Sequence, residues 1–106
     1  MPTRLAHTAN LVILVGGEGA LAETARQAAL YASGAQMLES PVATLATLAA
    51  ERRPYAIVVP RHIYDFGGSE LDALARDVGA GLVVVTDSIQ MEVLVTSLAD
   101  AASRLG

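Results

Sequence analysis

The sequence predicts a three-layer α/β fold in which four parallel strands, in the order 2-1-3-4, lie between two layers of helices. Four short apolar runs alternate with segments of helical length, a pattern typical of strand–helix units that repeat to form a parallel sheet. The chain of 106 residues has the size of one small domain. Right-handed connections then bring the loops that follow the strands to one edge of the sheet.

The first two predicted strands flank a helix. Leu11–Gly16 (LVILVG) is an unbroken apolar run that ends in glycine, which favours a central strand. The apolar stripe of Gly19–Ser33 predicts a helix, and Gly34 supplies the residue that stops it. Ala35–Glu39 (AQMLE) predicts a weaker strand nearer to an edge of the sheet.

Serine and proline mark the boundaries in the middle of the chain. Ser40 is expected to cap a helix over residues 41–52, with proline at the first helical position. A third strand, Ala56–Val59, stops at Pro60, and residues 61–67 are expected to form a loop.

The last part of the chain repeats the pattern. Ser69 is expected to cap a helix that ends at Gly79, and Leu82–Thr86 (LVVVT) predicts the fourth strand. Asp87 and Gln90 form a capping box for the last helix. The predicted buried face of that helix consists of Met91, Leu94, Val95, Leu98, Ala102 and Leu105.

Composition excludes several kinds of chemistry. All seven basic residues are arginine, so mechanisms that need a lysine ammonium group are absent. The chain has no cysteine, which removes disulfides and thiolate sites. Its two histidines, His7 and His62, are far apart in the sequence. We therefore expect no metal site and no cofactor.

Charge and hydropathy bear on partners and location. The net charge is −4 and no basic run exceeds two residues, so we expect no nucleic-acid partner. No apolar run is long enough to cross a membrane, and the first ten residues lack the apolar core of a signal peptide. We expect a soluble, cytoplasmic protein with no membrane insertion, in which residues 1–9 form a flexible lead and residues 10–106 one domain.

The glycine-rich turn after the first strand is a candidate phosphate-binding loop. Gly17, Gly19 and Ala22 match a G-x-G-x-x-A spacing at the start of a helix, where backbone N–H groups can hold a phosphate. Glu39 follows Gly19 by twenty residues, at the position from which a dinucleotide fold binds a ribose. A plain tight turn between strand and helix requires the same glycines, so both interpretations stay open.

The expected loop over residues 61–67 is a second candidate. His62 and Asp65 could form an acid–base pair, and Arg61 could bind an anion. The alternative is an exposed surface, including Tyr64, that contacts a partner protein.

The stretch RRPYAIVVPRHIYDFGGSEL resembles the third strand and following loop of bacterial response-regulator receiver domains. In that family a phosphoacceptor aspartate ends the strand, and Pro60 falls on its position. The first strand is similar as well, with Gly16 and Gly17 where the family has two Mg²⁺-binding acids. Thr86 matches the family's serine or threonine. The other residues that fit the family pattern are Arg53, Pro54, Gly68, Glu70 and Leu71.

The resemblance implies a flavodoxin-like, receiver-like fold without the family's chemistry. Phosphoryl transfer there needs the acids, the aspartate nucleophile and a lysine, and this chain has none of them at the matching positions. A receiver has five strands, so the fourth strand here corresponds either to the family's fourth strand or to its fifth.

The predicted function is that of a non-catalytic pseudo-receiver, a phosphorylation-independent domain that docks to a partner protein in a regulatory or scaffolding assembly, or pairs with itself as a homodimer. The expected interaction surface combines Arg61, His62, Tyr64 and Asp65 with Met91 and Val95 of the last helix. The alternative is a small-ligand module that binds a nucleotide or phosphate over residues 16–22, and acid–base catalysis by His62 and Asp65 is a weaker one.

Overall fold

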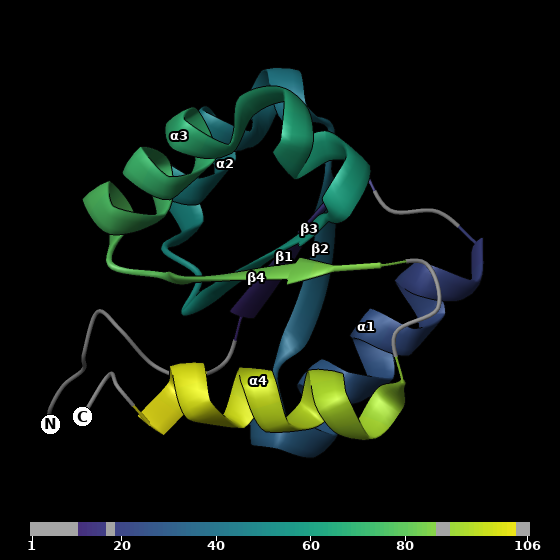
Figure 1. The fold of residues 1–106 in the computed structure, drawn as a ribbon. Coiled ribbons are helices and arrows are strands. Elements are labelled where there is room, and N and C mark those ends of the chain that lie inside the picture. The colour runs from purple at the N-terminus through teal and green to yellow at the C-terminus, as the bar shows by residue number, and fades with distance from the viewer. Residues whose placement is uncertain (1–10, 17–18, 87–89, 104–106) are drawn as a thin grey trace, which may run out of the picture.

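The computed structural model describes residues 11–16, 19–86 and 90–103. Four parallel strands form one sheet in the order β2-β1-β3-β4, with α2 and α3 on one face and α1 and α4 on the other (Figure 1). The predicted α/β class, strand number and strand order are confirmed. The elements are β1 Leu11–Val15, α1 Gly19–Ser33, β2 Gln36–Ser40, α2 Val42–Arg52, β3 Ala56–Pro60, α3 Arg61–Val78, β4 Gly81–Val85 and α4 Met91–Ser103.

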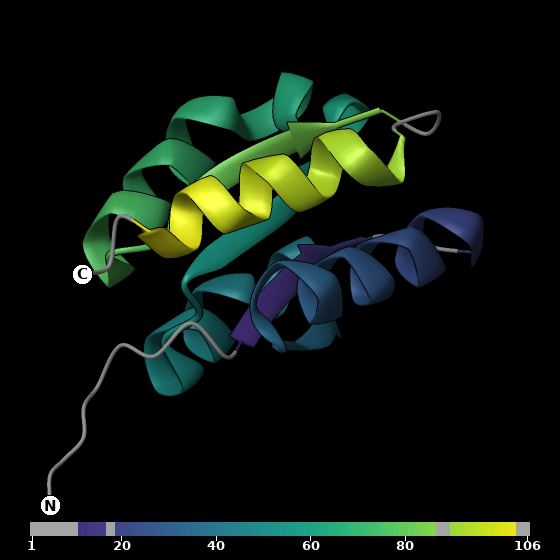
Figure 2. The same cartoon turned by 90° about the horizontal axis from the view of Figure 1, so that it is seen from below.

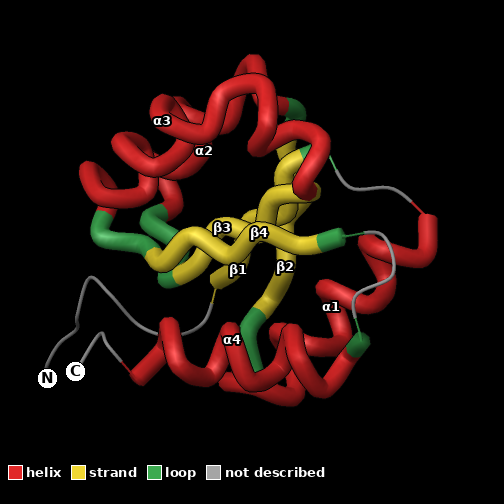
Figure 3. The backbone as a smooth tube through the Cα atoms, viewed as in Figure 1, coloured by secondary structure: helices red, strands yellow, loops and turns green. Residues whose placement is uncertain are grey.

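The two central strands, β1 and β3, are buried along their whole length. Successive residues point to opposite faces of a strand, so each strand supplies two apolar clusters. Val12 and Leu14 pack on the side of α1 and α4, whereas Ile13 and Val15 pack on the side of α2 and α3. Figure 3 shows the sheet between these two pairs of helices. Covering helices on both faces explain why β1 reads as a continuous apolar run.

Alanine lets α1 and α4 approach each other and the sheet. Ala25, Ala28 and Ala29 of α1 are fully buried, as are Leu94 and Leu98 of α4. Figure 2 shows the two helices side by side on one face of the sheet. Small side chains on α1 leave room for the leucines of α4, which is how an aliphatic core reaches close packing.

The predicted helix stops at glycine are confirmed. Gly34 and Gly79 have φ values of +69° and +75°, in the left-handed region that glycine adopts without strain. Arg53 ends α2 in the same conformation, with φ +52°, although no residue pattern predicts this for an arginine.

The predicted cap at Ser40 is wrong. Ser40 is the last residue of β2 and is buried, and its Oγ donates to the carbonyl of Pro41 at 2.9 Å. Pro41 occupies the N-cap position of α2, with no side-chain hydrogen bond. The strand extends one residue further than predicted because Ser40 pairs with Val15, and the Ser40 carbonyl accepts from the N–H of Gly16.

The helix α4 follows the prediction in part. Leu94 and Leu98 are buried as expected, and Ala101, which the apolar pattern did not single out, is buried with them. Asp87 of the predicted capping box and Leu105 lie outside the described residues, as do His7 and the predicted flexible lead. Among the described residues, no helix is both long enough and apolar enough to cross a membrane.

Candidate functional site

The segment predicted as a loop after the third strand is helical, which corrects the expectation for residues 61–67. Pro60 ends β3 and is also the N-cap of α3, with φ −62° and ψ 144°. The helix therefore starts at Arg61, and Gly67 interrupts it with φ −149° and ψ 40°. Ser69 lies within α3 after this kink rather than capping a new helix. The two adjacent glycines suggest a loop, but in the structure the break is confined to Gly67, where two helical parts of α3 meet at a kink.

Pro60 is buried, and proline is accepted at this position because β3 no longer pairs with β1 there. β1 and β3 pair over Val12–Leu14 and Ala56–Val58, so proline lies beyond the last paired residue on that side. Proline lacks a backbone N–H and is tolerated where the ladder does not need one. The side of β3 that faces β4 still pairs at this level, where Pro60 is the partner of Val85.

The polar side chains of the first turn of α3 are exposed. Arg61 and Asp65 form an ion pair at 3.7 Å, and their side chains are 67% and 65% exposed. An exposed pair of this kind contributes at most about 1 kcal/mol to stability. His62 is also exposed. Asp65 is thus directed to Arg61, whereas the acid–base alternative needs it to act with His62.

Tyr64 has contacts across the kink. Its hydroxyl donates to Oδ2 of Asp72 at 3.0 Å. A Cβ atom added to Gly68 would lie 2.8 Å from the Tyr64 ring. The hydrogen bond to the Asp72 carboxylate raises the pKa of the Tyr64 phenol. Tyr64, which the sequence placed on the interaction surface, is half-buried and holds the two parts of α3 together.

An apolar groove lies between α2 and α3. Its volume is about 490 Å³, and Glu70 is the charged residue in its lining. Phe66, the only phenylalanine of the chain, is 94% exposed beside this groove, and Val42 on the opposite rim is 52% exposed. The apolar lining includes Val42, Leu45, Ile63, Phe66 and Leu74.

This groove contains functional candidates that sequence reasoning missed. Ile63 and Phe66 are three residues apart and lie on one face once the segment is helical. The spacing of Ile63 and Phe66 can be read from the sequence. It places them on one face only if the segment is helical, and the segment was expected to be a loop. The single phenylalanine next to two glycines was the available signal.

Ile63 also fills the space beside Gly16, one of the two glycines that the receiver resemblance would place at acidic positions. Gly16 has φ +61°, and a Cβ atom built on it would lie 2.6 Å from Cδ1 of Ile63. Any side chain at residue 16 would therefore compete with Ile63 for the same space. Thr86 is exposed beyond the end of β4, and Gly17 lies outside the described residues.

The residues of the ligand-binding alternative come together in part. Ala22 and Glu39 line one shallow hollow of about 400 Å³ with Glu23, Arg26 and Met37. Gly19 is the first residue of α1. The structure thus brings the predicted carboxylate next to Ala22, the fourth residue of α1.

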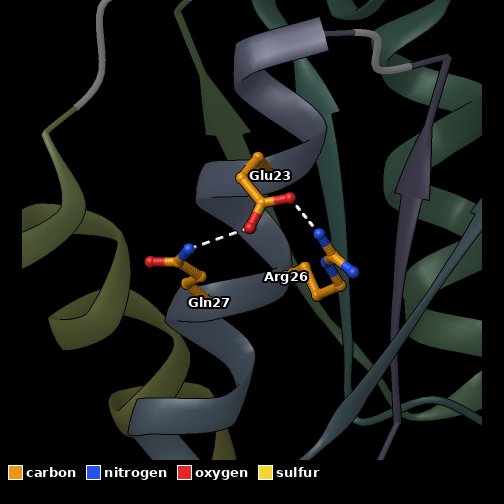
Figure 4. A network of polar contacts seen from close by, with 3 residues as sticks. All are labelled: Glu23, Arg26 and Gln27. Atoms are coloured by element: carbon orange, nitrogen blue, oxygen red, sulfur yellow. Dashed lines mark hydrogen bonds and ion pairs between the residues drawn. The ribbon is translucent and has the colours of Figure 1, made fainter.

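A polar network borders this hollow (Figure 4). Glu23 accepts hydrogen bonds from Arg26 and from Nε2 of Gln27, the latter at 2.8 Å. The bonds from Gln27 and Arg26 lower the pKa of the Glu23 carboxyl. The hollow has two carboxylates, those of Glu23 and Glu39, for one guanidinium. Arg26 is already engaged by Glu23, which weakens its attraction for an added anion.

Met91 and Val95 are the two residues of α4 in the predicted interaction surface. Both are half-buried and pack against the core cluster that α1 and α4 share. The helix face expected to be under-covered is covered by α1. Among the described residues, no group of three or more His, Cys, Asp or Glu side chains could hold a metal ion.

Comparisons with known proteins identify a solved structure with a similar fold. No family model and no curated protein matches it. One similar solved structure is the lactose-specific IIB component domain of the phosphoenolpyruvate:carbohydrate phosphotransferase system from Streptococcus pneumoniae, with a TM-score of 0.57 and 12% sequence identity. The match covers 93% of this chain and 95% of that chain. At this identity the likeness shows the flavodoxin-like α/β fold alone.

Proposed function

We propose that this chain is a non-catalytic docking domain, a phosphorylation-independent pseudo-receiver that binds a partner protein at the groove between α2 and α3. The observation that carries the proposal is the exposed ring of Phe66 beside an apolar groove. Aromatic side chains that fill or border such hollows are frequent anchors of protein interfaces.

The chemistry of the groove favours a particular partner. Its lining is apolar except for Glu70, and the whole chain carries a net charge of −4. An amphipathic segment with a basic residue would bury apolar side chains between the helices and place its charge near Glu70. A partner of opposite charge is also attracted over a distance, which speeds association.

The absence of phosphoryl chemistry has support from Ile63. Its methyl group takes the space that an acidic side chain at residue 16 would need, and Pro60 offers no nucleophile. The proposal expects no response of this protein to acetyl phosphate and Mg²⁺.

The test is a titration of the full chain with designed amphipathic peptides that share one apolar face and differ in charge, read from backbone amide NMR shifts. The basic peptide is expected to bind best and to shift residues of α2 and of the first turns of α3. Phe66→Ala should weaken binding at least about tenfold. Tyr31→Ala, which removes an exposed ring on α1, is the matched control and should have no effect.

Glu70→Gln tests the charge preference separately. It should lower the advantage of the basic peptide up to about fivefold, because one partly exposed charge pair contributes at most about 1 kcal/mol. The docking proposal would be abandoned if no peptide shifted the groove residues, or if Phe66→Ala bound as well as the original chain.

A second candidate function rests on the hollow that Ala22 and Glu39 share. A nucleotide would place its sugar at Glu39 and its phosphates near the start of α1. Titration with NAD, NADP and purine nucleotides tests it, with Glu39→Gln as the variant. Saturable shifts at these residues that the variant loses would favour this function over docking.

A further inference from the structure

The two edge strands of the sheet differ in chemistry. In β2 (QMLES), Gln36 and Glu39 are exposed and one of them is charged. In β4 (GLVVV), every side chain is apolar, and the first four residues are half-buried rather than fully buried. Figure 1 shows β4 at the near edge of the sheet, between α3 and α4. Charges, prolines and bulges normally protect an exposed edge from pairing with another chain, and β4 has none of these.

The backbone of β4 has free hydrogen-bonding groups that can be assigned. The N–H of Gly81 donates to the carbonyl of Tyr55 at 2.9 Å, so Gly81 faces β3. Alternate residues of a strand face the same neighbour, and Val83 and Val85 therefore also face β3. Leu82 and Val84 direct their N–H and C=O groups away from the sheet, to the open edge.

We propose that a second copy of this chain covers the edge, with the two β4 strands antiparallel about a twofold axis at Val83. In this register Leu82 lies opposite Val84 of the second copy, and Val84 opposite Leu82. Each pair exchanges two hydrogen bonds, which gives four bonds in total. The opposing side chains are apolar, and most are β-branched, which is a favourable combination for cross-strand pairs.

The helix α3 fits this arrangement. It packs on both β3 and β4. The two α3 axes would be separated by about two strand spacings, roughly 10 Å, which is within the usual distance between packed helices. Strand pairing alone would bury too little, because a stable dimer buries roughly 800 Å² on each partner. The helices beside the strands supply the additional contact.

Charges on α3 favour a second copy over an unrelated partner. Leu74 and Glu70 line the groove with α2, so Asp72 and Arg76, on the opposite side of the helix, face the β4 edge. Val83 lies about 7 Å along β4 from the first residue of the strand, Gly81. The same distance along a helix corresponds to roughly four to five residues. Measured back along α3 from its last residue, Val78, the same distance reaches the residues between Asp72 and Arg76. These residues therefore lie level with the twofold axis. Asp72 of each copy, whose Oδ2 also accepts from the Tyr64 hydroxyl, would then face Arg76 of the other.

The decisive variant is Val84→Pro in the full chain. It removes an outward N–H while the bonds to β3 remain, and proline is tolerated on an edge strand. Glu39→Pro is the matched control, because the Ser40 carbonyl faces β1 and the backbone of Glu39 therefore points outward at the other edge. Sedimentation equilibrium should give a dimer for the original chain and for Glu39→Pro, and a monomer for Val84→Pro.

Exchanging the charges of Asp72 and Arg76 tests the proposed dimer even if Val84→Pro fails to fold. Arg76→Asp should weaken the dimer about threefold to tenfold, because four carboxylates then gather along the two α3 helices. Asp72→Arg also removes the acceptor of the Tyr64 hydroxyl, so the exchange is made in a Tyr64→Phe background, where Asp72→Arg together with Arg76→Asp should restore the dimer. A chain that stays monomeric at millimolar concentration overturns the proposal. So does a dimer that a folded Val84→Pro or Arg76→Asp leaves unchanged.

Discussion

The contact between Gly16 and Ile63 yields the sharpest prediction about this structure. Gly16→Ala adds one methyl group in a conformation with φ +61°, at 2.6 Å from Cδ1 of Ile63. A left-handed conformation costs a residue with a side chain about 1–2 kcal/mol. The clash adds about 1 kcal/mol, at the low end for overpacking, because the terminal methyl of Ile63 can move aside. We expect a loss of about 2–3 kcal/mol.

Gly34→Ala is the matched control for this prediction. Gly34 has φ +69°, but a Cβ atom there would meet no other atom within 4 Å. The control therefore reports the backbone cost alone, about 1–2 kcal/mol. Urea unfolding followed by circular dichroism measures both variants, and the midpoint shifts are compared at equal slope.

A double-mutant cycle isolates the side-chain contact. Ile63→Ala removes the methyl group that Gly16→Ala would meet, so the double variant should lose about 1 kcal/mol less than the sum of the two single losses. Equal losses for Gly16→Ala and Gly34→Ala, with no coupling to Ile63, would refute the conclusion that Ile63 fills the space at residue 16.

Three further predictions concern stability. Leu98→Ala should lower the free energy of unfolding by about 2–5 kcal/mol, because Leu98 is fully buried between α4 and the sheet, and urea unfolding checks it. Phe66→Ala should change it by no more than about 0.5 kcal/mol, since the ring is exposed, and a larger loss would give Phe66 a structural role. For Tyr64, the folded pKa is raised, so the unfolded chain releases the phenolic proton first as the pH increases. Stability should therefore fall as the pH rises above the ordinary pKa of tyrosine, about 10. Tyr64→Phe should flatten that part of the pH profile, and an unchanged profile would contradict the assignment of its hydrogen bond to Asp72.

The elements of the fold were predictable because their signals are local. Leu11–Val15 is apolar without interruption and is followed by glycine, which favours a strand covered on both faces. Gly34 and Gly79 stop helices through their own backbone freedom. The alternation of strands and helices, with right-handed connections, then leaves few possible sheet orders.

The candidate site was less predictable because it depends on contacts between distant parts of the chain. The residues after Pro60 read as a loop, since Gly67 and Gly68 interrupt the pattern. In the structure, Ile63 packs on Gly16, and Tyr64 bonds to Asp72 across the kink. Contacts of this kind depend on other parts of the chain, so the composition of the segment itself does not indicate them.

The sequence by itself determined the class of fold, the number of strands and the absence of lysine and cysteine chemistry. Only the tertiary structure decided which surfaces are open. It packed Met91 and Val95 against the core that α1 and α4 share, exposed Phe66 beside the groove, and left the apolar strand β4 at an edge. Periodicity shows which residues of an element share a face, but what covers that face depends on elements that lie far away in the sequence.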